Sequence, residues 1–443
     1  MIYLLAIIIL FILIFTYYGV NRDLMHPSVL TIGATFLCVL AAIYNIKLWG
    51  INYHLNTFLI LVSGLLCISI TGIMCTKIKM KKRRRSMMDE KIVEEDQPFQ
   101  MNTIVFGAVI CFNILVLIWY YYIILKTTGG GAFTEMLAAF RMIHSYGVSS
   151  DDAVSMPALL NQCIKLNKVL AYIFVMIFLN NLVGYRKKDW KYLATPILFC
   201  LQTLLGSDRI YIVILAGASV VMAYLIWHRK YGWNRNISGK YMKIAVKALV
   251  ILLVFFFGVR NVVGHSSNQI NDPMEYITQY VGGSIQLLDM YVQQPLNEAD
   301  AGWGEESFSS IYKTIVQLQG QTPPKRHMEF RTSNGVMIGN IYTAVRKYYH
   351  DFSTVGVIVL CSIFGLFFGL MYRKLQQERV RKLMSYRLCL YCFIVHCTFY
   401  FPLDDLFFSG VISVNYISMF IYMWMVYRLI IEKPLKFRFG KIK

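Results

Sequence analysis

The chain begins with Met1-Ile-Tyr-Leu-Leu-Ala-Ile-Ile-Ile-Leu-Phe-Ile-Leu-Ile-Phe-Thr-Tyr-Tyr-Gly-Val20, a stretch in which no side chain is charged. Two later runs, Leu55–Thr76 and Met101–Leu125, are also free of charge. A helix needs about 20 apolar residues to cross about 30 Å of hydrocarbon. In lipid only helices and closed barrels satisfy their own backbone polar groups. Because the apolar residues are continuous rather than alternating, the pattern predicts membrane-spanning helices.

The composition excludes an ordinary soluble domain. Of the 443 residues, 57% are hydrophobic and 15% are charged, whereas soluble domains carry about 25% charged residues. We therefore predict an all-α, polytopic integral membrane helix bundle that forms a single domain over residues 1–443. Residues 1–20 lack the basic segment and the cleavage site of a signal peptide, so we expect a retained first span. The expected spans, about 11 in number, cover residues 1–20, 28–46, 55–76, 101–125, 163–185, 192–207, 210–228, 244–262, 353–372, 388–405 and 409–431.

The distribution of basic residues orients these spans. The net charge is +20, and the basic run Lys77–Arg85 follows the third span. Counted from there, every second connection is basic, namely those around 186–191, 229–243 and 373–382 and the tail 433–443. Basic connections stay in the cytoplasm, which predicts an outside N-terminus and a cytoplasmic C-terminus. Membrane orientation thus explains the charge, and we expect no nucleic-acid partner.

Two connections on the predicted outer face are long. One covers residues 126–162, and the other covers 261–351, between the eighth and ninth spans. The second is too apolar and aromatic to be disordered. Within it, Ser284–Gln294 and Phe308–Gln319 have the spacing of short amphipathic helices.

The predicted outer face also carries arginines, which the orientation rule disfavours there. A guanidinium matches a phosphate group bidentately, so a set of them could bind a lipid pyrophosphate. The alternative is that each arginine snorkels or pairs with a carboxylate such as Asp208, Asp272 or Glu275. The arginines are Arg141, Arg209, Arg260, Arg326, Arg331 and Arg346.

The stretch from Asn340 to Phe352 combines aromatic, cationic and titratable side chains just before the ninth span. In a helix, residues three and four apart share a face. Aromatic rings suit sugar binding, and an Asp or a His within hydrogen-bond reach of a hydroxyl is the usual general base. The alternative is an ordinary aromatic belt at the membrane interface. The residues concerned are Tyr342, Arg346, Tyr349, His350 and Asp351.

Several cofactor signals are weak or missing in the sequence. Cys389, Cys392, His396 and Cys397 have metal-like spacing, but they lie in an apolar run where thiols pack helices well. The sequence has no phosphate-binding loop, dinucleotide glycine pattern or zinc-protease motif. We therefore expect no metal and no cofactor.

Several stretches resemble the O-antigen, or oligosaccharide repeat-unit, polymerases of the bacterial Wzy-dependent pathway. The segment Asp23–Leu30 is similar to the entry of that family's second span, Gly206–Ile210 to its arginine-led span, and Tyr280–Asp289 to its large-loop entry. The strongest likeness is Asn340–Gly356, which matches an N-x-Y-T stretch followed by an arginine, an aromatic residue, Asp-Phe and a glycine. Two departures stand out: Lys347 replaces a common proline, and Ser353 replaces a common glycine.

The resemblance implies a glycosyltransferase of the bacterial cytoplasmic (inner) membrane. Such a polymerase transfers a growing glycan from undecaprenyl pyrophosphate onto the non-reducing end of an incoming lipid-linked repeat unit, at the outer face. The implied partners are this lipid-linked oligosaccharide, the bilayer and, as a candidate, a chain-length regulator. In this interpretation Asp351 or His350 is the catalytic base. The substrate-binding residues are Arg141, Arg209, Arg260, Arg331, Tyr342, Arg346 and Tyr349.

Other classes remain open at the level of sequence. A lipid-linked oligosaccharide flippase or transporter carries charge deep in its bundle, and a glycan ligase shares the layout and the arginines. A scaffolding or chain-length partner would need long heptads, which the sequence lacks. The sequence leaves open which sugars are joined, and whether the product is O-antigen, capsule or exopolysaccharide.

Overall fold

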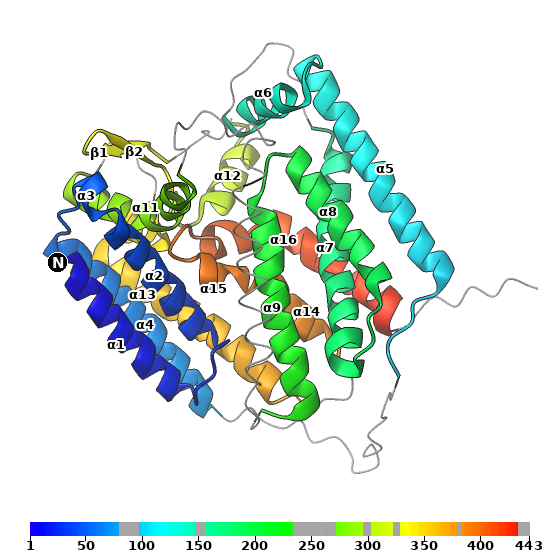
Figure 1. The fold of residues 1–443 in the computed structure, drawn as a ribbon, viewed down its shortest axis with the longest axis horizontal. Coiled ribbons are helices and arrows are strands. Elements are labelled where there is room, and N and C mark those ends of the chain that lie inside the picture. Colours follow the sequence, from blue (N-terminus) through cyan, green and yellow to red (C-terminus); the bar gives the residue numbers. More distant parts are fainter. Residues whose placement is uncertain are drawn as a thin grey trace, which may run out of the picture. The chain divides into compact units, whose positions relative to one another are not determined.

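The computed structural model describes residues 1–78, 97–146, 156–233, 272–295, 303–321, 328–378 and 383–432, together with Gly258 (Figure 1). These residues are almost entirely helical, and their one sheet is the hairpin of β1 (Arg331–Ser333) and β2 (Val336–Gly339). The helices are α1 (Ile2–Gly19), α2 (Pro27–Tyr44), α3 (Ile46–Trp49), α4 (Leu55–Lys77), α5 (Thr103–Thr128), α6 (Phe133–Tyr146), α7 (Ala158–Leu179), α8 (Ala194–Leu205), α9 (Ile210–Tyr231), α11 (Pro273–Gln293), α12 (Ser309–Leu318), α13 (Ala344–Gln376), α14 (Tyr386–Ile394), α15 (His396–Tyr400) and α16 (Val414–Tyr427).

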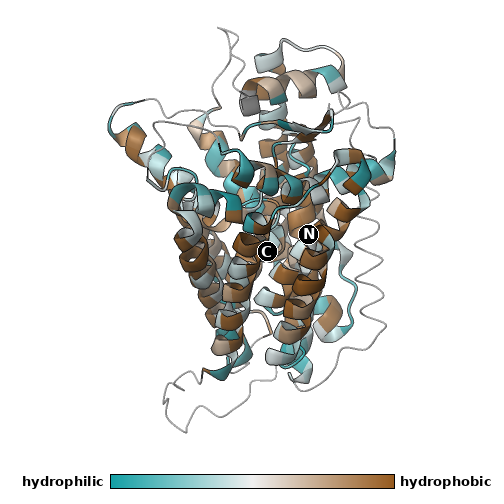
Figure 2. Cartoon of the chain, turned by 90° about the vertical axis from the view of Figure 1, so that its left-hand side faces the viewer, coloured by the Kyte–Doolittle hydropathy of each residue, from teal (hydrophilic) through white to brown (hydrophobic). Residues whose placement is uncertain are grey.

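Eight helices of the described residues are long and apolar enough to cross a membrane. The all-α membrane class is thereby confirmed at that level, and apolar residues dominate the long helices in Figure 2. These helices match the predicted spans 1–20, 28–46, 55–76, 101–125, 163–185, 210–228, 353–372 and 409–431.

The other three predicted spans do not correspond to any of these eight helices. Residues 244–262 lie outside the described residues. Span 192–207 corresponds to α8, which has 12 residues and follows a 3₁₀ turn at Trp190–Leu193. Span 388–405 is divided between α14 and α15, and α15 ends just before Pro402, whose ring cannot continue the helix. The predicted count of eleven spans and the predicted orientation therefore stay predictions.

The described helices group into two compact units. The first holds α1 to α4, α11 to α13, and α15, together with the hairpin. The second holds α5 to α9 and most of α14 and α16.

In the first unit, α13 packs along α4 in parallel, through small residues. Gly64 of α4 faces Val357 and Cys361 of α13, and further along Gly365 of α13 faces Ile68 of α4. Glycines let two backbones approach closely inside a membrane. A methyl group at Gly365 would lie 3.1 Å from the Ile68 backbone, so the contact has no room for a larger residue.

Also in the first unit, α11 is longer than the predicted segment Ser284–Gln294. It begins at Pro273, where the Asp272 carboxylate accepts a hydrogen bond of 2.9 Å from the Met274 amide, a typical N-cap. Gln279 of α11 donates to the Met337 carbonyl of β2 at 2.5 Å. The hairpin turn at Asn334 and Gly335 has positive φ angles of 52° and 75°, as a type I′ turn requires. These contacts fix the hairpin, and with it Arg331, beside α11.

The second unit contains buried polar contacts between its helices. Asn167 of α7 donates to Gln202 of α8 at 2.7 Å, and the Tyr192 hydroxyl accepts from the Met101 amide at 3.0 Å. These hydrogen bonds satisfy buried polar groups among apolar side chains, where an unpaired group is costly.

Candidate functional site

The first turn of α13 begins at Thr343, which caps the helix. Its hydroxyl accepts from the Arg346 amide at 3.3 Å, and the Ala344 amide donates to the Phe401 carbonyl at 3.0 Å. The helix is interrupted nine residues after Ala344, at Ser353, whose φ is 55° and ψ −157°. Residues 344–352 therefore form a short helix of their own before the long apolar one.

The backbone at Ser353 adopts a conformation that is unusual for a residue with a side chain. A positive φ is favourable for glycine and strained for other residues. Gly356 follows, and a methyl group there would overlap Phe352 and lie 2.7 Å from the Tyr348 carbonyl. The interruption is thus tightly packed, and it fixes the direction of the segment that carries Arg346, His350 and Asp351.

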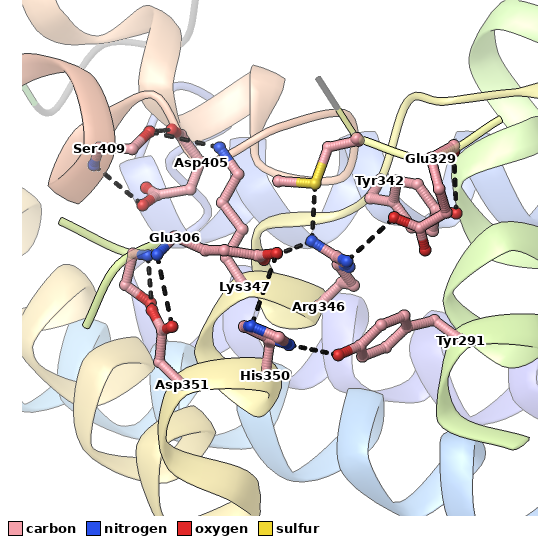
Figure 3. A network of polar contacts seen from close by, with 12 residues as sticks. Tyr291, Glu306, Glu329, Tyr342, Arg346, Lys347, His350, Asp351, Asp405 and Ser409 are labelled. Carbon is pink, nitrogen blue, oxygen red and sulfur yellow. Dashed lines mark hydrogen bonds and ion pairs between the residues drawn. The ribbon is translucent and has the colours of Figure 1, made fainter. Parts of the chain in front are cut away.

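Arg346 is 1% exposed and lies at the centre of a polar network (Figure 3). It forms ion pairs with Glu306 and, at 3.1 Å, with Glu329. Its guanidinium carbon lies 4.2 Å from the ring centre of Tyr291 and 4.9 Å from that of Tyr342. The two rings provide cation–π contacts, so the cation is compensated on all these sides. We call the following set the Arg346 network: Tyr291, Glu306, Glu329, Arg331, Tyr342, Arg346, His350 and Asp351.

Arg331 completes the network at the end of α11. Its guanidinium donates to the carbonyls of Met290 at 2.7 Å and Gln294 at 2.8 Å, and it pairs with Glu329 at 3.2 Å. The last carbonyls of a helix lack partners within the helix and favour a cation. Arg331 therefore joins the hairpin to the C-terminal end of α11.

His350 and Asp351, the predicted bases, both contact the network (Figure 3). One ring nitrogen of His350 contacts the Tyr291 hydroxyl, and the other lies 3.7 Å from the Glu306 carboxylate. Asp351 accepts backbone hydrogen bonds from Glu306 at 3.3 Å and Ser307 at 2.6 Å, one on each oxygen. Both oxygens of Asp351 thus hold the segment that carries Glu306.

The two tyrosines of the prediction differ in position. Tyr342 precedes the helix, is buried, and donates from its hydroxyl to the Glu329 carbonyl at 3.2 Å. Burial raises the pKa of Tyr342, as it raises the pKa of Tyr291 to about 12. Both therefore stay neutral donors at neutral pH. Tyr349 is half-buried on the same short helix and is not part of the network as defined.

A second cluster adjoins the network through the same turn of α13. Lys347 pairs with Asp404 at 2.6 Å, and the Tyr348 hydroxyl donates to Asp405 at 3.1 Å. Asp405 also accepts the amides of Phe407 and Phe408 at 3.0 and 3.1 Å and that of Ser409 at 3.1 Å. Lys347 thus attaches the 404–409 segment to α13.

Counted together, the described side chains of these two clusters are acidic. The cations are Arg331, Arg346 and Lys347. The carboxylates are Glu306, Glu329, Asp351, Asp404 and Asp405. A site of this charge suits hydroxyl-bearing sugars better than a free pyrophosphate, because carboxylates accept hydrogen bonds and repel anions.

The remaining predicted arginines belong to the second unit or lie outside the described residues. Arg209 is 5% exposed and precedes α9, two residues after Ser207. Ser207 has a φ of 60°, and its hydroxyl donates to the Leu137 carbonyl at 3.3 Å. Burial raises the pKa of the neighbouring Asp208 to about 6, and the charges of Arg141 and Lys168 oppose that shift. Arg260 and Arg326 lie outside the described residues.

We call Arg141, Lys168 and Asp208 the Asp208 cluster, because the charges of Arg141 and Lys168 act on Asp208. It contains two cations and one carboxylate. Its balance is therefore opposite to that of the Arg346 network. The sequence had singled out Arg141 and Arg209 but not Lys168, which the hydropathy pattern placed inside a span.

The metal-like cysteine and histidine spacing leads to no described metal site. Within the described ranges, no group of three or more His, Cys, Asp and Glu side chains is placed to hold a metal ion. His396 contacts the Tyr416 hydroxyl at 3.4 Å and the Cys397 sulfur at 3.8 Å.

Sequence reasoning missed Tyr291, Glu306 and Glu329. The last two lie 40 and 17 residues from Arg346 in the chain, so no local spacing relates them to it. A signal for Glu306 did exist: adjacent acids in a connection predicted to be outside, available to neutralise an arginine.

No family model, no curated protein and no solved structure matches this chain.

Proposed function

We propose that this chain is a glycosyltransferase that polymerises lipid-linked oligosaccharide repeat units at the outer face of a bacterial cytoplasmic membrane. The growing glycan leaves undecaprenyl pyrophosphate and joins the non-reducing end of the incoming unit. The observation that carries the proposal is the Arg346 network, which brings carboxylates, an imidazole and two tyrosine rings together at the start of an apolar helix. These are the groups that a hydroxyl-transferring site for sugars needs.

The Asp208 cluster of the second unit is, taken by itself, a candidate anion-binding site. Its excess of cations suits a pyrophosphate, which guanidinium groups bind bidentately and stabilise as charge develops. The donor is already activated by its pyrophosphate, so the missing nucleotide-binding motifs agree with the proposal. The 8 apolar helices fit a substrate whose anchor is a lipid.

The test uses the purified chain in lipid nanodiscs with lipid-linked repeat units isolated from a host strain that lacks this gene. We expect a ladder of glycan lengths without added nucleotide. We expect no ladder from the Arg346→Lys variant, which keeps the positive charge but loses the bidentate hydrogen bonding of the guanidinium group. Transport of the labelled substrate across liposomes without a ladder would indicate a flippase. Transfer of a single finished glycan to another acceptor would indicate a ligase. If Arg346→Ala and Asp351→Ala both polymerise at the wild-type rate, the site assignment is wrong.

A further inference from the structure

Neither predicted base presents an accessible atom to a substrate in the structure. Asp351 receives a backbone amide on each carboxylate oxygen, at 3.3 and 2.6 Å. His350 uses one ring nitrogen on the Tyr291 hydroxyl, and its other ring nitrogen is buried, without a hydrogen-bond partner among the described residues, 3.7 Å from the Glu306 carboxylate. A general base must have an oxygen or nitrogen within hydrogen-bond reach of the proton that it removes. Asp351 would have to give up a backbone contact to do so, and the unpaired nitrogen of His350 is covered by protein.

Glu306 meets the requirement better. Its carboxylate lies between Arg346 and His350, and its side chain is 11% exposed, against 7% for His350. Burial raises the pKa of Glu306, while the charges of Arg346 and His350 lower it and that of Asp351 raises it. The groups that face Glu306 are Arg346, His350 and Asp351 of the short helix, and its charge also acts on Lys347 and Tyr291.

We infer that Glu306 is the general base of the transfer and that Asp351 is its positioning residue. Asp351 fixes the backbone of Glu306 and Ser307, and this places the Glu306 carboxylate against Arg346 and His350 (Figure 3). This inference rests on the proposed function. It assigns the hydroxyl-bearing acceptor sugar to the acidic Arg346 network.

The acceptor oxygen forms a bond to the anomeric carbon of the donor while its proton passes to the Glu306 carboxylate. The bond from that carbon to the lipid pyrophosphate breaks, and the pyrophosphate leaves with the electron pair. Glu306 then releases the proton to water.

The experiment measures ladder formation against pH for Glu306→Gln, Glu306→Asp and Asp351→Asn, with Glu275→Gln as a control carboxylate outside the network. We expect Glu306→Gln to lower kcat by about 10²- to 10⁴-fold, the usual contribution of a general base, with KM changed less than about threefold. Glu306→Asp should still form ladders, at a reduced rate that again falls at low pH. This result would show that the loss in Glu306→Gln comes from the missing base and not from misfolding.

Asp351→Asn tests whether Asp351 acts on Glu306 electrostatically, because a purely structural role would not shift the acid limb of the pH–rate profile. The activity of a base is lost as pH falls through its pKa, and the Asp351 charge raises the pKa of Glu306. Removing that charge should move the acid limb to lower pH, in addition to lowering kcat. Glu275→Gln should change neither quantity.

The outcomes separate the two levels of the proposal. A wild-type ladder that persists in Glu306→Gln within about threefold of the wild-type rate overturns this inference and leaves the proposed function standing. An acid limb that does not move in Asp351→Asn overturns the positioning role. A folded wild-type chain that makes no ladder overturns the proposed function, and this inference with it.

Discussion

At the scale of single residues, Arg346 depends on partners far away in the chain. Its charge is balanced by Glu306 and Glu329, and its faces are covered by Tyr291 and Tyr342. A buried cation is tolerable when it is paired and hydrogen-bonded, and breaking such a pair leaves an uncompensated charge. Arg346 therefore contributes to folding as well as to any chemistry.

Arg346→Ala should destabilise the chain by about 3–5 kcal/mol, because it leaves the half-buried Glu306 without its arginine partner and Glu329 with Arg331 alone. Arg346→Lys should cost less, since it keeps one charge. Thermal unfolding in detergent measures both. An unchanged unfolding temperature for Arg346→Ala would show that the network carries no stability.

Ser353 offers a prediction in the other direction. Ser353→Gly should stabilise the chain by about 1 kcal/mol, because glycine adopts a positive φ without strain. Ser353→Ala is the matched control: it keeps the strained backbone, so it should bring no gain. Equal unfolding temperatures for the two variants would contradict the assigned backbone geometry.

Single-residue reasoning from the sequence succeeded where spacing was local. Helical spacing groups Tyr342, Arg346, Tyr349 and His350. The structure brings Tyr342, Arg346 and His350 into one network, although Tyr342 lies before the helix, and Tyr349 is not part of that network. Glu306 and Glu329 were missed because they come from connections 40 and 17 residues away. Asp351 was expected to be a base, yet its contacts depend on the path of the 303–308 segment, which no local pattern specifies.

At the scale of elements, α13 carries Arg346, His350 and Asp351 in its first turns and packs along α4. Gly365 lies against Ile68 and Thr71. A methyl group added at Gly369 would lie 2.9 Å from the Cys75 sulfur. The hydropathy pattern predicted both helices but not their partnership, since glycines within apolar runs carry no unique meaning. The 3₁₀ turn and α8 together, Trp190–Leu205, are as long as the predicted span 192–207. The predicted span 388–405 extends past the end of α15 at Tyr400, because hydropathy measures burial as well as lipid contact.

Gly365→Ala should separate α4 from α13 and cost about 1–3 kcal/mol, the usual range for overpacking. Gly107→Ala in α5 is the matched control, because a methyl group there meets nothing within 4 Å. Alanine is the better helix former, so the control should be neutral or slightly stabilising. Unfolding of both variants in detergent makes the comparison. A neutral Gly365→Ala would mean that the two helices do not pack as described.

At the scale of the whole molecule, the prediction from sequence concerns orientation. Eight described helices can span a membrane, and the basic connections alternate along the chain. Alternation of charge is a property of the sequence alone, so it could be predicted without knowing any contact.

Reporter fusions test that orientation. Green fluorescent protein fused after Lys443 should fluoresce, because it folds in the cytoplasm. Alkaline phosphatase inserted after Gln321 should be active, because it folds outside. Phosphatase inserted in the basic run Lys77–Arg85 is the control and should be inactive. The opposite pattern would place the Arg346 network on the cytoplasmic side and remove its access to an outward-facing substrate.

The most direct test of the central claim is the stoichiometry of the reaction. Purified chain, lipid-linked repeat units and no nucleotide are incubated, and mass spectrometry counts new glycosidic bonds and released undecaprenyl pyrophosphate. The proposed polymerase predicts one released lipid pyrophosphate for every bond formed, with lengthened glycans still attached to lipid. Intact substrate with neither bonds formed nor lipid released, from a chain shown to be folded, would contradict it.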